Sequence, residues 1–210
     1  MPFEPGSKRV IAFIDGQNLF FAAKAAFGYN HPNYDPLALA RRVTESRGWD
    51  LVGVSFYTGV PARSDNPRWS AFWAEKLGFM GTRGVRTFSR TLRYRTQVVT
   101  LPDGSVTKIR VGQEKGIDVR LALDAVRLAR EDAYDVALVF SQDQDLSEVA
   151  DEIRAVSRAF GRWIKIASAF PVSDLARTNR GIDKTDWIPI DRALYDSCLD
   201  PHDYRPRLES

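Results

Sequence analysis

Three aspartates follow apolar runs at positions where α/β proteins commonly place ligand-binding residues. Asp15 follows the run 8–14, within FIDGQN, and Asp143 and Asp145 follow the run 135–140, within SQDQD. If both runs are parallel strands, their carboxyl ends lie at the edge where open α/β sheets bind ligands. We therefore expect these three carboxylates to lie close together.

Asp118 is expected to approach the same edge from a helix. Apolar residues recur three, four and seven positions after it, so Asp118 lies in line with the inward-facing stripe of a helix at residues 117–131. Asp124 falls on another side of this helix, four residues after Arg120, where a solvated ion pair is expected.

The acids have an alternative role as helix caps: Asp15 could cap a helix at 17–27, and Asp143 or Asp145 a helix at 146–159. A cluster of unpaired carboxylates is costly, because two unit charges about 4 Å apart repel by about 4 kcal/mol at an effective dielectric constant near 20. A divalent cation removes this cost, and oxygen ligands favour Mg²⁺ or Mn²⁺. The clustering therefore favours a metal site over capping alone.

Short runs rich in β-branched and aromatic residues alternate with amphipathic segments along the chain. Such runs suit strands that are buried on both faces. The alternation predicts an α/β fold with a doubly wound, mainly parallel sheet flanked by helices. The predicted strands are residues 8–14, 51–57, 135–140 and 162–167. The predicted helices are residues 17–27, 36–47, 67–77, 117–131 and 146–159.

A β-hairpin inserted at about residues 90–112 is expected to interrupt this alternation. Its predicted strands, 97–101 and 105–111, flank the turn Pro102-Asp103-Gly104. Proline presets φ in such a turn, and glycine accepts positive φ.

The region around this hairpin carries the basic charge of the chain. Residues 83–115 contain eight basic and two acidic residues, a net charge of +6, whereas the whole chain has a net charge of only +3. Strand-borne arginines and lysines suit contacts with a phosphate backbone. A charged edge that only prevents aggregation is the alternative. The predicted phosphate contacts are Arg93, Arg95, Lys108 and Arg110.

The composition narrows the class of protein. With 44% hydrophobic and 27% charged residues, the chain is typical of globular domains.

We expect an N-terminal extension at 1–7, one domain at 8–191 and a C-terminal tail at 192–210. Apolar runs shorter than about 18 residues predict no membrane helix. Because no signal peptide precedes Asp15, we expect a cytoplasmic protein. The sequence leaves open whether it forms a homodimer.

Several kinds of site are excluded. The single cysteine, Cys198, rules out an intramolecular disulfide and cysteine-based metal sites. The two histidines, His31 and His202, are far apart in sequence, which disfavours a histidine zinc site and a Ser-His-Asp triad. The glycine-rich motifs of nucleotide-binding loops are missing. Four aromatic residues are expected mainly in the core: Phe20, Phe21, Trp69 and Trp73. Base stacking by either tryptophan is the alternative.

Three segments together resemble the signature of the NYN domain family, and more narrowly its LabA-like branch. They are FIDGQN, EKGIDVRLALDA at residues 114–125 and DVALVFSQDQDLSEV at residues 135–149. The resemblance covers about residues 8–191 and implies a PIN-like fold and a metal-dependent ribonuclease. The residues that it matches to functional positions of the family are Asp15, Asn18, Asp118, Ser141, Asp143 and Asp145.

Two positions depart from the family pattern. Where the family usually has a glycine before the first of the paired acids and a small residue after it, this chain has Gln142 and Gln144. Losing the glycine removes positive-φ freedom from the turn. The departures therefore support an alternative in which the chain is a non-catalytic nucleic-acid-binding or regulatory module with a degenerate site.

The combined hypothesis is hydrolysis of RNA phosphodiester bonds with Mg²⁺ or Mn²⁺. Asp15, Asp118 and Asp143 are the predicted metal ligands, and Asp145 is expected to hold a second ion or the attacking water. A metal-dependent phosphatase for small substrates is a third possibility, but it does not explain the basic hairpin. Besides the four hairpin residues, the predicted substrate contacts are Asn18, Lys115 and Ser141.

Overall fold

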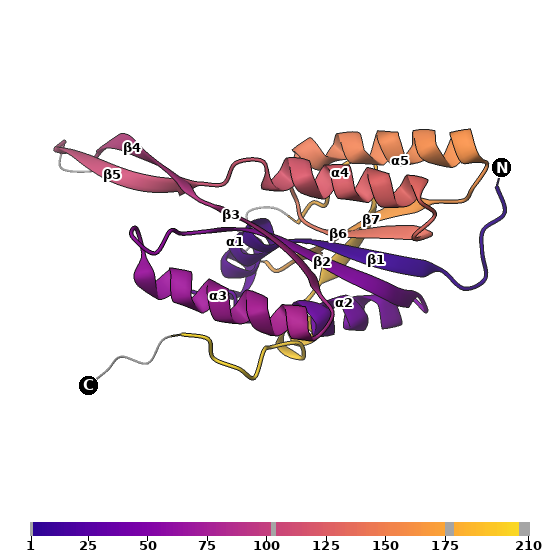
Figure 1. Cartoon of the computed structure of the whole chain (residues 1–210), viewed down its shortest axis with the longest axis horizontal. Coiled ribbons are helices and arrows are strands. Elements are labelled where there is room, and N and C mark those ends of the chain that lie inside the picture. Colours follow the sequence, from indigo (N-terminus) through magenta and orange to yellow (C-terminus); the bar gives the residue numbers. More distant parts are fainter. Residues whose placement is uncertain (1, 102–103, 175–178, 206–210) are drawn as a thin grey trace.

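The strand β1 (Arg9–Asp15) lies inside a six-stranded sheet in which each described pairing is parallel. The computed structural model describes residues 2–101, 104–174 and 179–205. The strand order is β3-β2-β1-β6-β7-β8, so the chain builds one half of the sheet before it crosses β1 and builds the other (Figure 1). The remaining strands are β2 (Asp50–Val60), β3 (Arg86–Thr91), β6 (Val136–Phe140), β7 (Lys165–Pro171) and β8 (Asp186–Ile190).

Helices cover both faces of this sheet because the side chains of β1 alternate between two apolar clusters. Val10, Ala12 and Ile14 pack with α1 (Gly16–Phe27), α2 (Pro36–Glu45) and α3 (Pro67–Thr82). Ile11 and Phe13 pack on the other face with α4 (Ile117–Arg130) and α5 (Ser147–Phe160). Figure 1 shows α4 and α5 above the sheet and α2 and α3 below it. None of the helices in the described ranges combines the length and the apolarity needed to cross a bilayer.

The predicted doubly wound α/β fold is confirmed, and two strands are added to it. Each predicted run forms a strand, but β3 (RTFSRT) and β8 (DWIPI) were not predicted. Both are edge strands. Five of the six residues of β3 are exposed, and β8 contains Pro189. Edge strands tolerate polar residues and proline because one side of the strand needs no partner.

The two strands of the inserted hairpin are longer than predicted, and they form a separate two-stranded antiparallel sheet. Its strands are β4 (Arg93–Thr100) and β5 (Val106–Gln113). Of the predicted turn, Gly104 has a φ of +83°, and residues 102–103 lie outside the described residues. The hairpin projects from the body beyond the carboxyl ends of the central strands (Figure 1).

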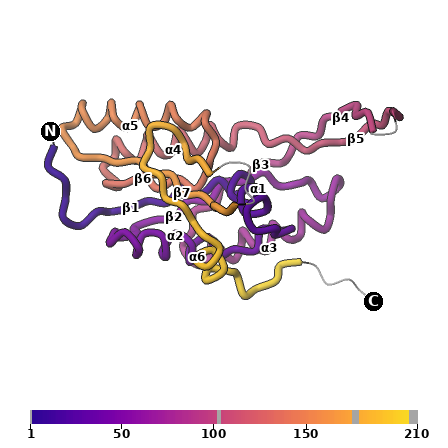
Figure 2. The backbone as a smooth tube through the Cα atoms, turned by 180° about the vertical axis from the view of Figure 1, so that it is seen from behind, coloured from indigo at the N-terminus to yellow at the C-terminus, as the bar shows by residue number. Residues whose placement is uncertain are grey.

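The segment after Asp191 packs against the domain. It begins with α6 (Arg192–Asp196), and Tyr195, Cys198 and Tyr204 are buried in the cluster that also contains α1, α2 and α3. Figure 2 shows this yellow segment running from α6 along the lower side of the molecule. The segment that follows Asp191 therefore contributes three side chains to the hydrophobic core.

Candidate active site

Asp15 lies at the carboxyl end of β1 and accepts hydrogen bonds from two residues. Its Oδ1 accepts the N–H of Asn18 at 3.0 Å, which caps α1, and its Oδ2 accepts the hydroxyl of Ser141 at 3.4 Å. Only 6% of the residue is exposed. Burial raises the pKa of Asp15 to about 6, and the negative charges of Asp143 and Asp118 also raise it. Asp15 is thus both a helix cap and a member of an acidic cluster.

Glu114 belongs to this cluster, although it is not among the site residues predicted from the sequence. It follows β5 directly, and its Oε1 accepts the backbone N–H of Gly59. With its amide oriented to donate, Gln17 lies 3.1 Å from both carboxylate oxygens. Burial raises the pKa of Glu114 to about 7, and the charges of Asp15 and Asp118 add to this rise. A Cβ at position 59 would lie 2.6 Å from Glu114 Cγ, so this close approach requires the glycine.

Asp118 lies in the first turn of α4 and is half-buried, as the helical periodicity predicted. The residue before this helix, Gly116, has a φ of +72° and provides no side-chain cap. The negative charge of Asp118 contributes to the raised pKa values of Asp15 and Glu114, so the three carboxylates interact electrostatically.

Asp124 is less exposed than predicted. The expected pair with Arg120 is present at 2.9 Å, but Asp124 also accepts the hydroxyl of Tyr57 at 3.1 Å, and its side chain is only 13% exposed. Burial opposes ionisation of Asp124, but the hydrogen bonds from Arg120 and Tyr57 outweigh it and lower the pKa. Asp124 is therefore a partly buried link between α4 and β2 rather than a solvated residue.

The loop after β6 positions Asp143 toward the cluster and Asp145 away from it. Ser141 Oγ accepts the N–H of Asp143 at 3.1 Å while it donates to Asp15. Asp143 Oδ1 accepts the N–H of Asp145 at 3.0 Å at the start of the 3₁₀ turn η1 (Gln144–Leu146). Asp143 is half-buried, whereas Asp145 is exposed. Asp145 is thus at the outer edge of the site.

The two glutamines that depart from the family pattern join this loop to the segment at residues 180–183. Gln142 donates its side-chain amide to the carbonyl of Arg180 at 2.8 Å, and Gln144 donates to that of Gly181 at 3.0 Å. The side-chain oxygen of Asn18 accepts the N–H of Gln142 at 2.9 Å, so Asn18 fixes this loop. Gln142 is not among the described non-glycine residues with positive φ. The turn therefore forms without the glycine.

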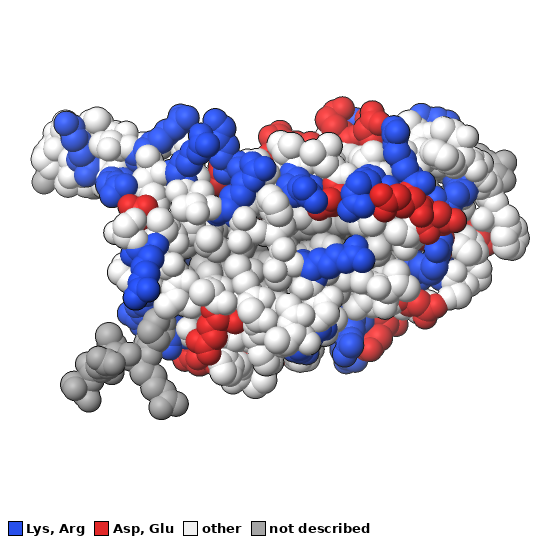
Figure 3. All heavy atoms as spheres, viewed as in Figure 1, with Lys and Arg blue, Asp and Glu red and all other residues white. Residues whose placement is uncertain are grey.

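The predicted phosphate contacts lie on both faces of the hairpin. The strand register pairs Arg95 with Val111 and Thr96 with Arg110. Because directly opposed residues share a face, the register places Arg93 and Arg95 on one face and Lys108 and Arg110 on the other. Figure 3 shows lysine and arginine side chains along the hairpin and onward over β3 and α4.

Arg110 and Lys115 have further contacts. The guanidinium of Arg110 lies over the ring of Tyr94, 5.0 Å from its centroid, and 3.2 Å from Asp65. Lys115 is exposed beside Glu114, and its carbonyl accepts a hydrogen bond from Arg90. The positive charge of the hairpin thus begins directly next to the carboxylates.

The carboxylates fit a hydrated cation better than a closed protein cage. In the described parts of the chain, no three His, Cys, Asp or Glu side chains are close enough together to hold one metal ion by themselves. Mg²⁺ usually keeps several waters and binds through one or two carboxylates plus substrate phosphates. A cation at this edge would take one or two of the carboxylates as ligands, and waters and phosphate oxygens would complete its coordination.

The fold is a PIN-like α/β fold with an acidic cluster at the carboxyl edge of its sheet. Residues 9–170 match the NYN domain, and the chain belongs to this family, whose members generally have a nuclease-type fold. Among curated proteins no match was found.

Two solved structures are similar to this chain. One is a protein of unknown function, VPA0982 from Vibrio parahaemolyticus, with 17% identity, a TM-score of 0.52, and coverage of 88% of this chain and 94% of that one. The other is MurG from Acinetobacter baumannii, with 12% identity, a TM-score of 0.34, and coverage of 87% and 45%. The first supports the fold alone.

Proposed function

We propose that this protein is a ribonuclease that hydrolyses RNA phosphodiester bonds with Mg²⁺ or Mn²⁺, and that it is a LabA-like member of the family. The observation that carries the proposal is that the buried Asp15 and the half-buried Glu114 lie near Asp118 and Asp143, and that burial raises the pKa of both Asp15 and Glu114. Perturbed carboxylates at a sheet edge are typical of functional sites.

Asp15, Asp143 and Asp118 would hold the metal, directly or through water. A bound divalent cation supplies an acidified water and stabilises charge on the phosphate oxygens. Ser141 orients the Asp15 carboxylate by donating to it. Gln17 and the N–H of Gly59 orient Glu114. Lys115 and the arginines of the hairpin supply positive charge for the phosphate backbone.

A nucleic-acid-binding module without turnover is the second candidate. It is favoured by the spacing of the carboxylates, because no three of the described acids converge closely. In that case the basic hairpin would bind RNA, and the acidic cluster would not hold a metal that cleaves it.

Cleavage of labelled single-stranded RNA and DNA in Mn²⁺ tests the proposal. We expect RNA to be cut, and Asp143→Asn to lose nearly all activity because residues that act as a unit fail together. Asp186→Asn, an exposed aspartate at the start of β8, is the matched control and should keep activity. Millimolar Mn²⁺ should also raise the Tm, since it binds only the folded state, and Asp15→Asn should reduce this rise. Binding of RNA without cleavage in either metal would favour the second candidate.

A further inference from the structure

We propose that the groove between α1, α3 and the base of the hairpin holds an unpaired nucleobase of a single-stranded RNA. The adjoining cationic hollow would then hold a backbone phosphate of the same strand. This inference rests on the proposed function, because it names the form in which the substrate enters that site.

The aromatic groove is a hollow of about 200 Å³. Its aromatic and aliphatic walls come from Phe20, Phe21, Trp69, Trp73, Leu92 and Tyr94. Trp73 is buried as expected, but Phe21 is 53% exposed, so the prediction that these residues serve mainly the core is wrong for Phe21. Phe20, Trp69 and Tyr94 are half-buried. Aromatic rings that remain accessible in a groove form a stacking surface for bases, which single-strand-binding proteins use without strict sequence preference.

The groove is continuous with the acidic cluster. Gly16 and Gln17, which follow Asp15 directly, line it from α1, and Gly59 lines it from β2. Gln17 and Gly59 are also the residues that contact Glu114. A base in the groove would therefore place its own sugar-phosphate linkage beside the carboxylates.

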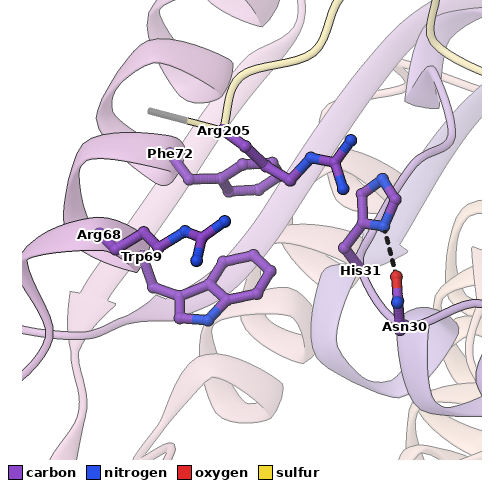
Figure 4. Close-up of a pocket in the computed structure, with 6 residues that line it drawn as sticks. All are labelled: Asn30, His31, Arg68, Trp69, Phe72 and Arg205. Carbon is purple, nitrogen blue, oxygen red and sulfur yellow. Dashed lines mark hydrogen bonds between the residues drawn. The ribbon is translucent and has the colours of Figure 1, made fainter. Parts of the chain in front are cut away.

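The cationic hollow lies on the other side of Trp69, which lines both spaces. Its volume is about 220 Å³, and Arg68 and Arg205 line it together with His31. Figure 4 shows both guanidinium groups directed into this space, and the His31 ring lies beside the Arg205 guanidinium. Arg205 also pairs with Asp203 at 2.6 Å, but no carboxylate is among the residues that line the hollow. Two converging guanidiniums suit a phosphate group.

The arrangement of these features favours single-stranded RNA as the ligand. The aromatic groove and the cationic hollow share Trp69 on the side of the sheet that carries α1 and α3, and Gln17 and Gly59 of the groove also contact Glu114. A base can occupy the groove only when it is unstacked and unpaired, as it is in single-stranded RNA. A duplex would keep its bases inside and leave the aromatic rings uncovered. An apolar peptide would leave Arg68 without an anion, whereas Arg205 is already paired with Asp203.

Binding without cleavage tests this inference directly. A short fluorescein-labelled single-stranded RNA, the same sequence as a duplex, and the same strand with abasic positions are titrated with the protein in EDTA, and the Kd is measured by fluorescence anisotropy. We expect the intact single strand to bind more tightly than the duplex and the abasic strand. Phe21→Ala should weaken single-strand binding by about fivefold or more, the range expected for one base stacked on one ring.

Two controls separate stacking from charge. Arg68→Ala should weaken binding and reduce the slope of log K against log salt by about 0.7, whereas Phe21→Ala should leave that slope unchanged. The matched variants Phe160→Ala and Arg158→Ala change exposed residues of α5 on the opposite face of the sheet. Neither should alter binding.

Equal affinity for duplex and single strand would overturn the inference. So would unchanged binding in both Phe21→Ala and Arg68→Ala, or an effect of Phe21→Ala on self-association in place of RNA binding. The proposed function can fail separately: if the groove binds single strands as expected but Mn²⁺ produces no cleavage, the inference holds and the nuclease assignment does not.

Discussion

Burial disfavours the charged forms of Asp15 and Glu114, so the free energy of unfolding depends on their protonation. The pKa of Glu114 rises from 4.5 to about 7 on folding, and that of Asp15 from 3.8 to about 6. Between these values the folded state binds protons that the unfolded state has already released. Stability must therefore fall as the pH rises through this window and level off above about pH 7.

Glu114→Gln should flatten this dependence. In EDTA, we expect the Tm of the native protein to fall more steeply than that of the variant between about pH 5 and about pH 8, because the variant has no proton to lose. Differential scanning fluorimetry at several pH values measures both curves. Glu152→Gln, an exposed acid on α5, should follow the native curve. Parallel curves for native protein and Glu114→Gln would contradict the burial of this carboxylate.

The sequence could predict some members of the cluster for definite physical reasons. Asp15 and Asp143 follow strands of the main sheet, and Asp118 follows helical periodicity, so simple geometry places all three near the carboxyl edge of the sheet. Glu114 follows a strand of the inserted hairpin, to which the rule for parallel sheets does not apply. Its position two residues before Gly116, the residue that precedes α4, was the available signal.

At the level of elements, the hairpin is a ribbon with two basic faces. Lys108 and Arg110 share their face with Tyr94, a wall of the aromatic groove, whereas Arg93 and Arg95 face the other way. A single strand that follows the groove would contact the first pair more closely than the second.

Replacing the two pairs separately should distinguish the faces. We expect Lys108→Ser with Arg110→Ser to reduce the salt slope of single-stranded RNA binding by about 1.4, at roughly 0.7 per contact. Arg93→Ser with Arg95→Ser should reduce it less. The metal-induced rise in Tm should survive in both variants, because none of these residues is a proposed ligand. Salt titrations that show no change for either pair would mean that the hairpin is not an RNA-binding arm.

Buried strands were easier to predict than edge strands. A strand with neighbours on both sides needs a nearly continuous apolar run, and β1, β2 and β6 have one. The sequence of β3 is mostly polar because most of its side chains are exposed, so the main signal of a strand was missing there.

Over the whole molecule, a buried ion pair ties the C-terminal segment to α3. Lys76 Nζ lies 3.1 Å from Asp200 Oδ2, and their side chains are only 1% and 4% exposed. Lys76 also donates to the carbonyl of Tyr34 at 2.9 Å. The partners are 124 residues apart in sequence, so no local pattern could reveal this contact, and the segment after Asp191 looked like a tail.

Removing one partner should destabilise the fold strongly. We expect Lys76→Met to lower the free energy of unfolding by about 3 kcal/mol or more, because Asp200 is then buried without a counter-charge. Adding Asp200→Leu should recover much of this loss. Lys165→Met, which breaks the more exposed pair with Asp186, should cost less than about 1 kcal/mol. Urea unfolding measures all three, and equal small losses would refute a buried pair.

The hairpin also bears on how quickly this chain can find its fold. It separates the edge strand β3 from α4, which leads back to β6 beside the centre of the sheet. As a structureless loop it would add chain entropy to that crossing, whereas local antiparallel pairing brings its two ends together within roughly 1–10 μs. Shortening the effective connection about fivefold lowers the entropic cost of closure by about 1.4 kcal/mol. An insertion whose strands pair locally therefore adds little entropic cost to the folding of the rest of the chain.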